Sequence, residues 1–487
     1  MNIMQTTTLH THCIPRLVAL AAAALLAGCA LGPDYAGPPD AAPHAAQNGH
    51  FVRGDASSTA AMPSNRWWEG LNDPILNSLV QRALEANPNL GAARARLQQS
   101  RAALNLEQAN ALPSVGASAL AAHARLPPLN LGGLSSSSGS STSANLYSLG
   151  FDATWEVDLF GAHKRSIQAA GASAEAAQAT LADVQVSLAA EVANAYINLR
   201  DRQQRLALGD ESIRAQEQML GLTSQRVERG TASSLDLIRM QNQLDGTRAD
   251  LVPLQADKEA YLNQLATLAG QEPGALDAEL ALAAPVPLPP AEVAVGDPTS
   301  LLRRRPDIRA AERTLAADTA KIGQAEAAKY PSLKLLGIIG LGGTHPSDLT
   351  RLDDFAAIGA PMLSWNFLDF GRARSRVTQA ERVRDEAEMK YRQTVLDALR
   401  DAEDSLSRFR YGRVTVATVA RTKVSADRAL ELARQRYAAG TGTLIDVLDT
   451  TRQQITAQQN LLQAEAALTR SFVGIQKALG LGWSDEG

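Results

Sequence analysis

The chain has 487 residues, a formal net charge of −4, seven histidines and two cysteines. The small negative charge argues against nucleic acid as a partner, and histidines and cysteines this few and scattered form no metal or redox framework. Aromatic residues make up only 4% of the chain. Long stretches rich in Ala, Gln, Arg and Leu instead favour long helices over a large globular core.

Residues 1–28 have the features of a targeting segment. Their apolar run, residues 17–26, is far shorter than the roughly 20 residues of a membrane-spanning helix. The run ends in Leu26-Ala27-Gly28-Cys29, a pattern that resembles a bacterial lipobox, where cleavage leaves an acylated cysteine at the N-terminus. An ordinary signal peptide with a chance cysteine is the alternative. We therefore expect a covalent lipid on Cys29, no other cofactor, and a lipidated tether over residues 29–73.

The rest of the chain contains an internal repeat. Trp155 and Trp365 begin similar segments at an offset of 210 residues (365 minus 155), and the same offset relates Gly230 to Gly440. Upstream the offset is 218, so the first repeat has 8 extra residues (218 minus 210), which we assign to a serine-rich loop. The expected organisation is repeat 1 at 74–284, a proline-rich linker at 285–299, repeat 2 at 300–480 and a C-terminal tail at 481–487.

Each repeat is expected to hold a shorter helix, two strands, and a hairpin of two long helices. The shorter helices are predicted at about 89–111 and 307–329. Apolar residues then recur every three or four positions in proline-free stretches, which is typical of coiled-coil helices. A continuous helix from residue 162 to about 229 would be about 100 Å long at 1.5 Å per residue. Gly209 and Gly221 are the positions where it is most open to interruption.

Between the helices the apolar period changes to two. From Tyr147 to Leu159 the odd-numbered residues are apolar or aromatic and the even-numbered ones mostly polar. Partner strands are expected at about 114–125 and 333–341. Such alternation with terminal aromatics is typical of transmembrane β-strands, although a strand pair half-buried in a soluble domain is the alternative. The predicted membrane-face aromatics are Tyr147, Phe151, Trp155, Phe355, Trp365 and Phe367.

Four strands per chain cannot close a barrel with a useful interior. In lipid, an open sheet edge leaves unpaired backbone groups that cost several kcal/mol each. Three chains with four strands each give twelve, an even number within the known range. The predicted fold class is therefore an α+β membrane protein, in which a homotrimer shares a 12-stranded β-barrel that a helical coiled-coil barrel continues.

We find no catalytic arrangement in the sequence. None of the seven histidines has a serine, cysteine or carboxylate partner at a recognisable motif spacing. The chain is therefore not expected to be an enzyme.

In the order of its motifs the chain resembles the TolC-like outer-membrane factor family, most closely the lipoprotein branch of OprM- and NodT-type channels. The motifs are the lipobox ending at Cys29, Gly32-Pro33-Asp34-Tyr35, Trp67-Trp68, Asn87-Pro88-Asn89-Leu90, and the duplicated turns around Gly230 and Gly440. The resemblance covers nearly all of residues 26–480. It implies a homotrimer in outer-membrane lipid with a long periplasmic α-barrel. It also implies docking to a periplasmic adaptor (membrane fusion) protein joined to an inner-membrane RND-type transporter, with passive outward conduction of drugs or other small molecules.

The same resemblance implies two functional regions at the turns of the long hairpins. The adaptor-docking tips would be Arg226, Gly230, Ser234, Leu235, Asp236, Arg436 and Gly440. The periplasmic aperture would be formed by Ile445, Asp446, Asp449 and Arg452. Simple helix caps, with Ser234 capping the second helix, are an alternative for the tips, and an ordinary surface ion pair is one for Asp449 and Arg452.

Two other functions remain open from the sequence. One is the outer-membrane duct of type I protein secretion. The other, of a different class, is a lipid-anchored coiled-coil scaffold without a pore, in which the alternating segments would be soluble hairpins.

Overall fold

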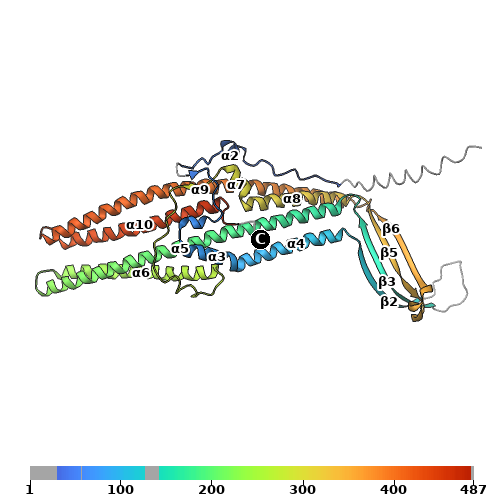
Figure 1. Ribbon diagram of the computed structural model, residues 1–487, viewed down its shortest axis with the longest axis horizontal. Helices are drawn as coiled ribbons and strands as arrows, with labels where there is room; N and C mark the ends of the chain where they lie inside the picture. Colours follow the sequence, from blue (N-terminus) through green and yellow to red (C-terminus); the bar gives the residue numbers. More distant parts are fainter. Residues whose placement is uncertain (1–29, 56–57, 127–141, 484–487) are drawn as a thin grey trace, which may run out of the picture. The chain divides into compact units, whose positions relative to one another are not determined.

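The computed structural model describes residues 30–55, 58–126 and 142–483. The targeting segment, Cys29 and most of the serine-rich insertion lie outside these residues. The elements (Figure 1) are α2 (Pro43–Asn48), β1 (Ser58–Thr59), η1 (Trp67–Leu71), α3 (Pro74–Ala86), α4 (Pro88–Asn110), β2 (Ser114–Leu126), β3 (Thr142–Val157), α5 (Ala162–Glu228), α6 (Ser234–Leu268), β4 (Val293–Ala294), α7 (Pro298–Arg304), α8 (Pro306–Ala327), β5 (Ser332–Gly343), η2 (Pro346–Thr350), η3 (Leu352–Asp354), β6 (Phe355–Ser364), α9 (Arg372–Ala438) and α10 (Leu444–Ala478).

The elements recur in the same order in the two halves of the chain. The helices α5 and α9 have 67 residues each, and α6 and α10 have 35 each. The shorter helices α4 and α8 begin and end within two residues of the predicted bounds. The fold is therefore mostly helical with a small amount of sheet, as predicted. None of the described helices is both long and apolar enough to cross a membrane.

Gly209, one of the positions predicted to be open to interruption, and Pro253 both lie inside long helices. The helix α5 is continuous through Gly209, where a Cβ atom would lie 2.3 Å from Leu251 of α6. Glycine therefore allows close helix packing there. The helix α6 continues through Pro253, because the buried Leu251 and Leu254 on either side hold it against its neighbours. Tertiary packing here outweighs the loss of one backbone hydrogen bond.

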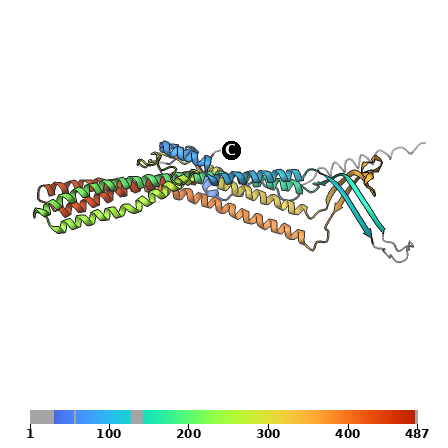
Figure 2. The same cartoon turned by 90° about the horizontal axis from the view of Figure 1, so that it is seen from below.

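The chain divides into two compact units, and each draws on both halves of the sequence. The strand unit comprises Met1–Pro38, Gln98–Glu175 and Glu312–Met389. The hairpin unit comprises Pro39–Leu97, Ala176–Ala311 and Lys390–Gly487. In the hairpin unit, α6 lies along α5 and α10 lies along α9 (Figure 2).

The strand unit contains one antiparallel sheet in the order β2-β3-β5-β6. The strands β2 and β5 agree with their predicted positions within two residues. The strand β6 ends at Ser364, so the placement of Trp365 and Phe367 within an alternating strand is wrong. Both residues follow the strand, on the way to α9.

The core of the hairpin unit gathers around two tryptophans near the start of the chain. The rings of Trp67 and Trp68 meet edge to face at 5.7 Å, and Trp67 meets Phe472 of α10 at 6.2 Å. Tyr196, fully buried in α5, donates a hydrogen bond of 2.6 Å to Asp73. Burial and this bond raise the pKa of Tyr196. The other oxygen of Asp73 caps α3, so one carboxylate joins the tether region to the long helix.

Candidate functional site

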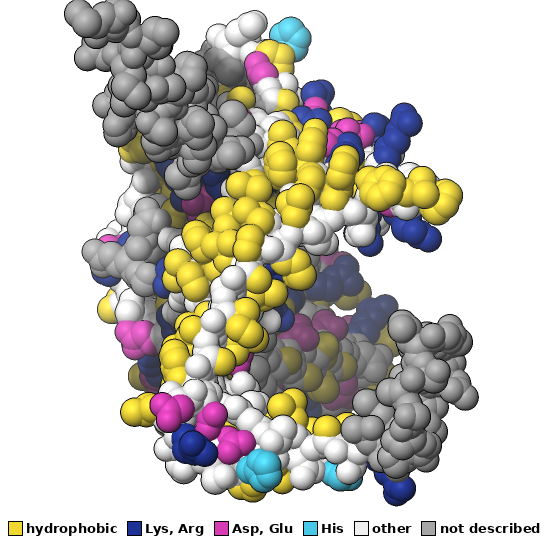
Figure 3. All heavy atoms as spheres, turned by 90° about the vertical axis from the view of Figure 1, so that its right-hand side faces the viewer, with side chains coloured by type: hydrophobic (Ala, Val, Ile, Leu, Met, Phe, Trp, Pro, Cys, Tyr) yellow, Lys and Arg dark blue, Asp and Glu magenta, His cyan; other side chains and the backbone are white. Residues whose placement is uncertain are grey.

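One face of the sheet is apolar across all four strands. Residues paired across strands share a face, and Phe151 pairs with Ala117 and Ile339, which in turn pairs with Ala357. Every paired odd-numbered position is apolar or glycine, except near the connection between β2 and β3. The odd-numbered large side chains Leu149, Phe151, Ile339 and Phe355 are exposed. Figure 3 shows hydrophobic side chains gathered over the strands.

The opposite, even-numbered face is divided between polar and apolar strands. On β3 it carries Asp152 and Glu156, and Glu156 lies 3.3 Å from Lys334 of β5. On β5 and β6 it carries Ile338, Ile358 and other apolar residues. The predicted polar alternation on the even face therefore holds for β3. The even positions of β2, β5 and β6 are mostly apolar or small, with only a few polar residues such as Lys334.

Two tryptophans anchor the ends of the strands in equivalent ways. The indole Nε1 of Trp155 donates to the carbonyl of Ala111, just beyond α4, at 3.0 Å. The indole Nε1 of Trp365 donates to the carbonyl of Lys329, just beyond α8, also at 3.0 Å. Both rings are exposed. A large apolar ring with a satisfied N–H suits the boundary between hydrocarbon and water.

The two hairpin turns of the hairpin unit have the same capping geometry. Gly230 and Gly440 adopt positive φ angles of 69° and 72°, which glycine tolerates and other residues rarely adopt. The amide of Thr231 donates to the carbonyl of Arg226 at 2.8 Å, and that of Thr441 to Arg436 at 2.9 Å. The helices therefore end at these glycines, as the sequence predicts.

The second helix of the first hairpin begins at Ser234, one residue earlier than a cap at Ser234 would allow. Ser233, rather than Ser234, caps α6 by accepting from the amide of Leu235 at 3.1 Å. The assignment of the cap to Ser234 is wrong, because Ser234 is already helical. At the equivalent turn, Thr443 caps α10 and exchanges hydrogen bonds with Asp446. These bonds lower the pKa of Asp446.

Arg226 and Tyr437 make a contact between the ends of the two hairpins. Arg226 of α5 donates a hydrogen bond to the hydroxyl of Tyr437 of α9, and its guanidinium lies 5.5 Å from the centre of the ring. Tyr437 lies beside Arg436 in the second of the duplicated turns, and no role was predicted for it. Its counterpart in the first repeat is Val227, so the contact cannot be repeated by symmetry, and that difference was the available signal.

The remaining predicted residues lie on exposed helix surfaces at these turns. Leu235 and Ile445 are exposed. Asp236 lies 3.9 Å from Arg239, and Asp449 lies 3.6 Å from Arg452. Within one chain, the proposed aperture residues therefore form one exposed end of α10 with an ion pair along it.

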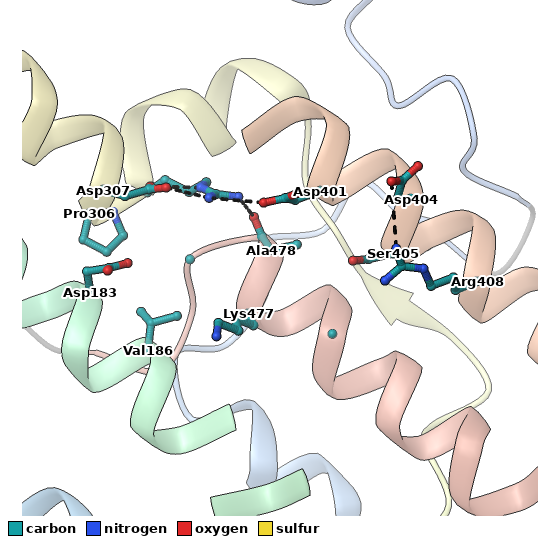
Figure 4. A pocket seen from close by; sticks show the side chains of 13 residues that line it. Asp183, Val186, Pro306, Asp307, Asp401, Asp404, Ser405, Arg408, Lys477 and Ala478 are labelled. Atoms are coloured by element: carbon teal, nitrogen blue, oxygen red, sulfur yellow. Dashed lines mark hydrogen bonds and ion pairs between the residues drawn. The ribbon is translucent and has the colours of Figure 1, made fainter. Parts of the chain in front are cut away.

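A charged cavity of about 260 Å³ lies elsewhere in the hairpin unit (Figure 4). Arg305 bonds Asp307 at 2.6 Å and the carbonyl of Ala478 at 2.8 Å, and so joins the start of α8 to the end of α10. Burial and the nearby Asp307 raise the pKa of Asp183, while Arg305 and Lys477 oppose them. Over the described residues, no group of histidine, cysteine and carboxylate side chains has a geometry that could hold a metal ion.

A sheet with one face apolar across all four strands, in a chain with helices of 67 residues, is the architecture of an outer-membrane channel protein. A family model described as outer membrane efflux protein matches residues 79–271 and 298–481. The chain belongs to this family, which is a family of channels and not of enzymes.

Individual relatives agree with this assignment. The pyoverdine export outer membrane protein OpmQ of Pseudomonas aeruginosa is 31% identical over 433 residues, covering 88% of this chain and 90% of the relative. Nodulation protein T of Rhizobium leguminosarum bv. trifolii is 29% identical, covering 94% and 96%. The solved outer-membrane channel OprN superposes with a TM-score of 0.87 and 33% identity, covering 93% of this chain and 100% of OprN. The predictions of an outer-membrane efflux channel and of its location are confirmed.

Proposed function

We propose that three copies of the chain form one duct, with a shared twelve-stranded barrel in the outer membrane and a helical barrel in the periplasm. The single observation that carries the proposal is the sheet with its apolar face. Among the described residues, its outer strands β2 and β6 each pair on one side only. In lipid each unpaired backbone group costs several kcal/mol. Pairing β2 of one copy with β6 of the next removes both edges.

The duct receives its cargo from a periplasmic adaptor and an inner-membrane RND-type transporter. The exposed Leu235 and Ile238 at the first hairpin turn offer an apolar contact for the adaptor, beside the well-capped helix ends. Cargo is conducted passively as drugs or other small molecules. Relatives named for pyoverdine export and for toluene efflux support small molecules as the cargo class. Acylation of Cys29 adds a second attachment to the outer membrane.

Planar-bilayer recording of the purified, detergent-extracted protein tests the proposal. We expect a trimer on native gels and discrete conductance steps. A monomer that gives no steps at any voltage would favour the pore-free scaffold instead. Loss of drug resistance in a deletion strain, with secreted proteins unchanged, separates efflux from type I protein secretion.

Replacing Asp449 and Arg452 by alanine should make the aperture leakier. In a trimer the three carboxylates and three guanidinium groups form a charged constriction, and their joint removal takes away the ion pairs and the electrostatic barrier without changing the net charge. We expect several-fold greater sensitivity to large antibiotics and a larger single-channel conductance. Arg239→Ala is the matched control, since Arg239 occupies the position equivalent to Asp449 in the first repeat. Equal effects of the control and the double variant would contradict the assignment.

A further inference from the structure

Residues 30–35 occupy a slot in the strand unit that is built around Arg165. This arginine side chain is only 3% exposed. Its Nε donates to the carbonyl of Leu31 at 2.9 Å, and its two terminal nitrogens donate to the carbonyl of Gly32 at 3.0 Å and the carboxylate of Asp34 at 2.8 Å. The amide of Leu31 donates to the carbonyl of Phe160 at 3.2 Å. The buried guanidinium of Arg165 therefore binds three residues of this segment: Leu31, Gly32 and Asp34.

The segment fits in the slot because glycines lie at its closest contacts, both in the segment and in the residues that line the slot. A Cβ atom on Gly32, whose φ is +82°, would lie 2.4 Å from the Cα of Gly323 in α8. A Cβ atom on Gly323 would lie 2.5 Å from the carbonyl oxygen of Leu31. On the other side, a Cβ atom on Gly161 would lie 2.6 Å from the Cα of Ala30. Backbone meets backbone along the segment, so it cannot slide without breaking these contacts.

Tyr35 closes the slot at its far end. Its hydroxyl lies 3.3 Å from Glu312, and the guanidinium of Arg313 lies 5.6 Å from the centre of its ring. Arg313 is itself held by Glu175 of α5 at 3.1 Å. Both α5 and α8 therefore contribute to holding the segment.

We propose that Arg165 is a positioning residue that fixes the lipidated N-terminus of the chain beside the base of the sheet. The inference rests on the proposed acylation of Cys29. Leu31 is two residues from Cys29, so at most about 7 Å of chain separates them. Its partner Phe160 follows the end of β3 at Val157 by three residues. The acyl chains therefore enter the bilayer next to the strands of their own subunit.

This placement means that the contacts of Arg165 with residues 31–34 do more than stabilise the segment locally. Two attachments joined by a short, fixed link act at high effective concentration toward each other, whereas a long flexible link weakens that coupling. Without the contacts of Arg165, the lipid would be connected to the rest of the chain only through a flexible N-terminal segment. The lipid would then hold the sheet near the membrane less effectively and would promote its insertion less.

Chymotryptic cleavage after Tyr35 measures the grip directly on the full-length protein in detergent. Arg165→Ala removes three charge-assisted hydrogen bonds and should accelerate cleavage about tenfold to a hundredfold, since cleavage follows opening of the segment. Arg165→Lys keeps the charge but not the fork of donors and should lie between. Lys164→Ala, at the exposed neighbouring position, is the matched control and should cleave at the wild-type rate. An unchanged cleavage rate in Arg165→Ala would contradict the proposal that Arg165 holds residues 31–34 in place.

A second comparison separates positioning from a merely structural role. Wild type and Arg165→Ala are each made with the native leader and with a non-lipoprotein leader plus Cys29→Ala, and trimer in the outer membrane is quantified. Arg165→Ala should reduce trimer several-fold with the lipid and hardly at all without it. An equal loss in both backgrounds would overturn the positioning role. Mass spectrometry of the wild-type N-terminus reports acylation independently, so a missing lipid would be recognised as failure of the proposed lipidation and would remove the positioning role with it.

Discussion

Ile339→Arg should abolish assembly in the outer membrane, whereas Ile338→Arg, one residue away on β5, should leave assembly intact. In the isolated chain the side chains of Ile339 and Ile338 are equally accessible, 48% and 52% exposed, so burial does not distinguish them. They differ in the face of the sheet on which they lie. Ile339 shares its row with Phe151 and Ala357 on the apolar face, which faces lipid in the proposed barrel. An arginine at the lipid midplane costs about 2–4 kcal/mol, and the trimer contains three copies.

The readouts are the amount of protein in the outer-membrane fraction and the unheated trimer band on gels. Ile338→Arg, on the opposite face, should form trimers that conduct with a shifted preference toward anions. Ile338→Leu and Ile339→Leu serve as volume-matched controls and should behave as wild type. Equal loss of trimer in the two arginine variants would contradict the assignment of the lipid face.

Arg226→Ala should open the hairpin ends and raise single-channel conductance. The hydrogen bond and the contact with the Tyr437 ring together are worth about 1–2 kcal/mol at an exposed site. Their loss shifts the balance between joined and separated ends about tenfold. Tyr437→Phe keeps the ring and loses only the hydroxyl, so its effect should be smaller and in the same direction.

Arg436→Ala provides the control, because Arg436 is the counterpart of Arg226 in the second repeat. It removes the same charge from the other hairpin and leaves the contact between the hairpins intact. Planar-bilayer conductance and sensitivity to large antibiotics report the result. If Arg436→Ala raised conductance as much as Arg226→Ala, net charge at the turns would be the cause instead of the contact.

The sequence by itself determined the elements and their repetition. The change of apolar period from 3.6 to 2 indicated β3, and β2 and β5, expected as partner strands, lie within two residues of their predicted bounds. The absence of proline located α5 and α9. Glycine at residues 230 and 440 marked both helix ends. These features depend on neighbours a few positions apart, so the local pattern contains the information needed to predict them.

Only the tertiary structure decided which distant groups meet. Arg165 reaches a segment 134 residues before it, and Arg226 reaches Tyr437 across 211 residues. Such pairs have no period and no fixed spacing, and an arginine on a helix reads the same whether it is solvated or buried. Pro253 shows the converse, since packing keeps α6 helical where the local rule predicts an interruption. Inside a helix, glycine costs about 1 kcal/mol and proline about 3 kcal/mol relative to alanine, and contacts between helices that are far apart in the chain can exceed these costs.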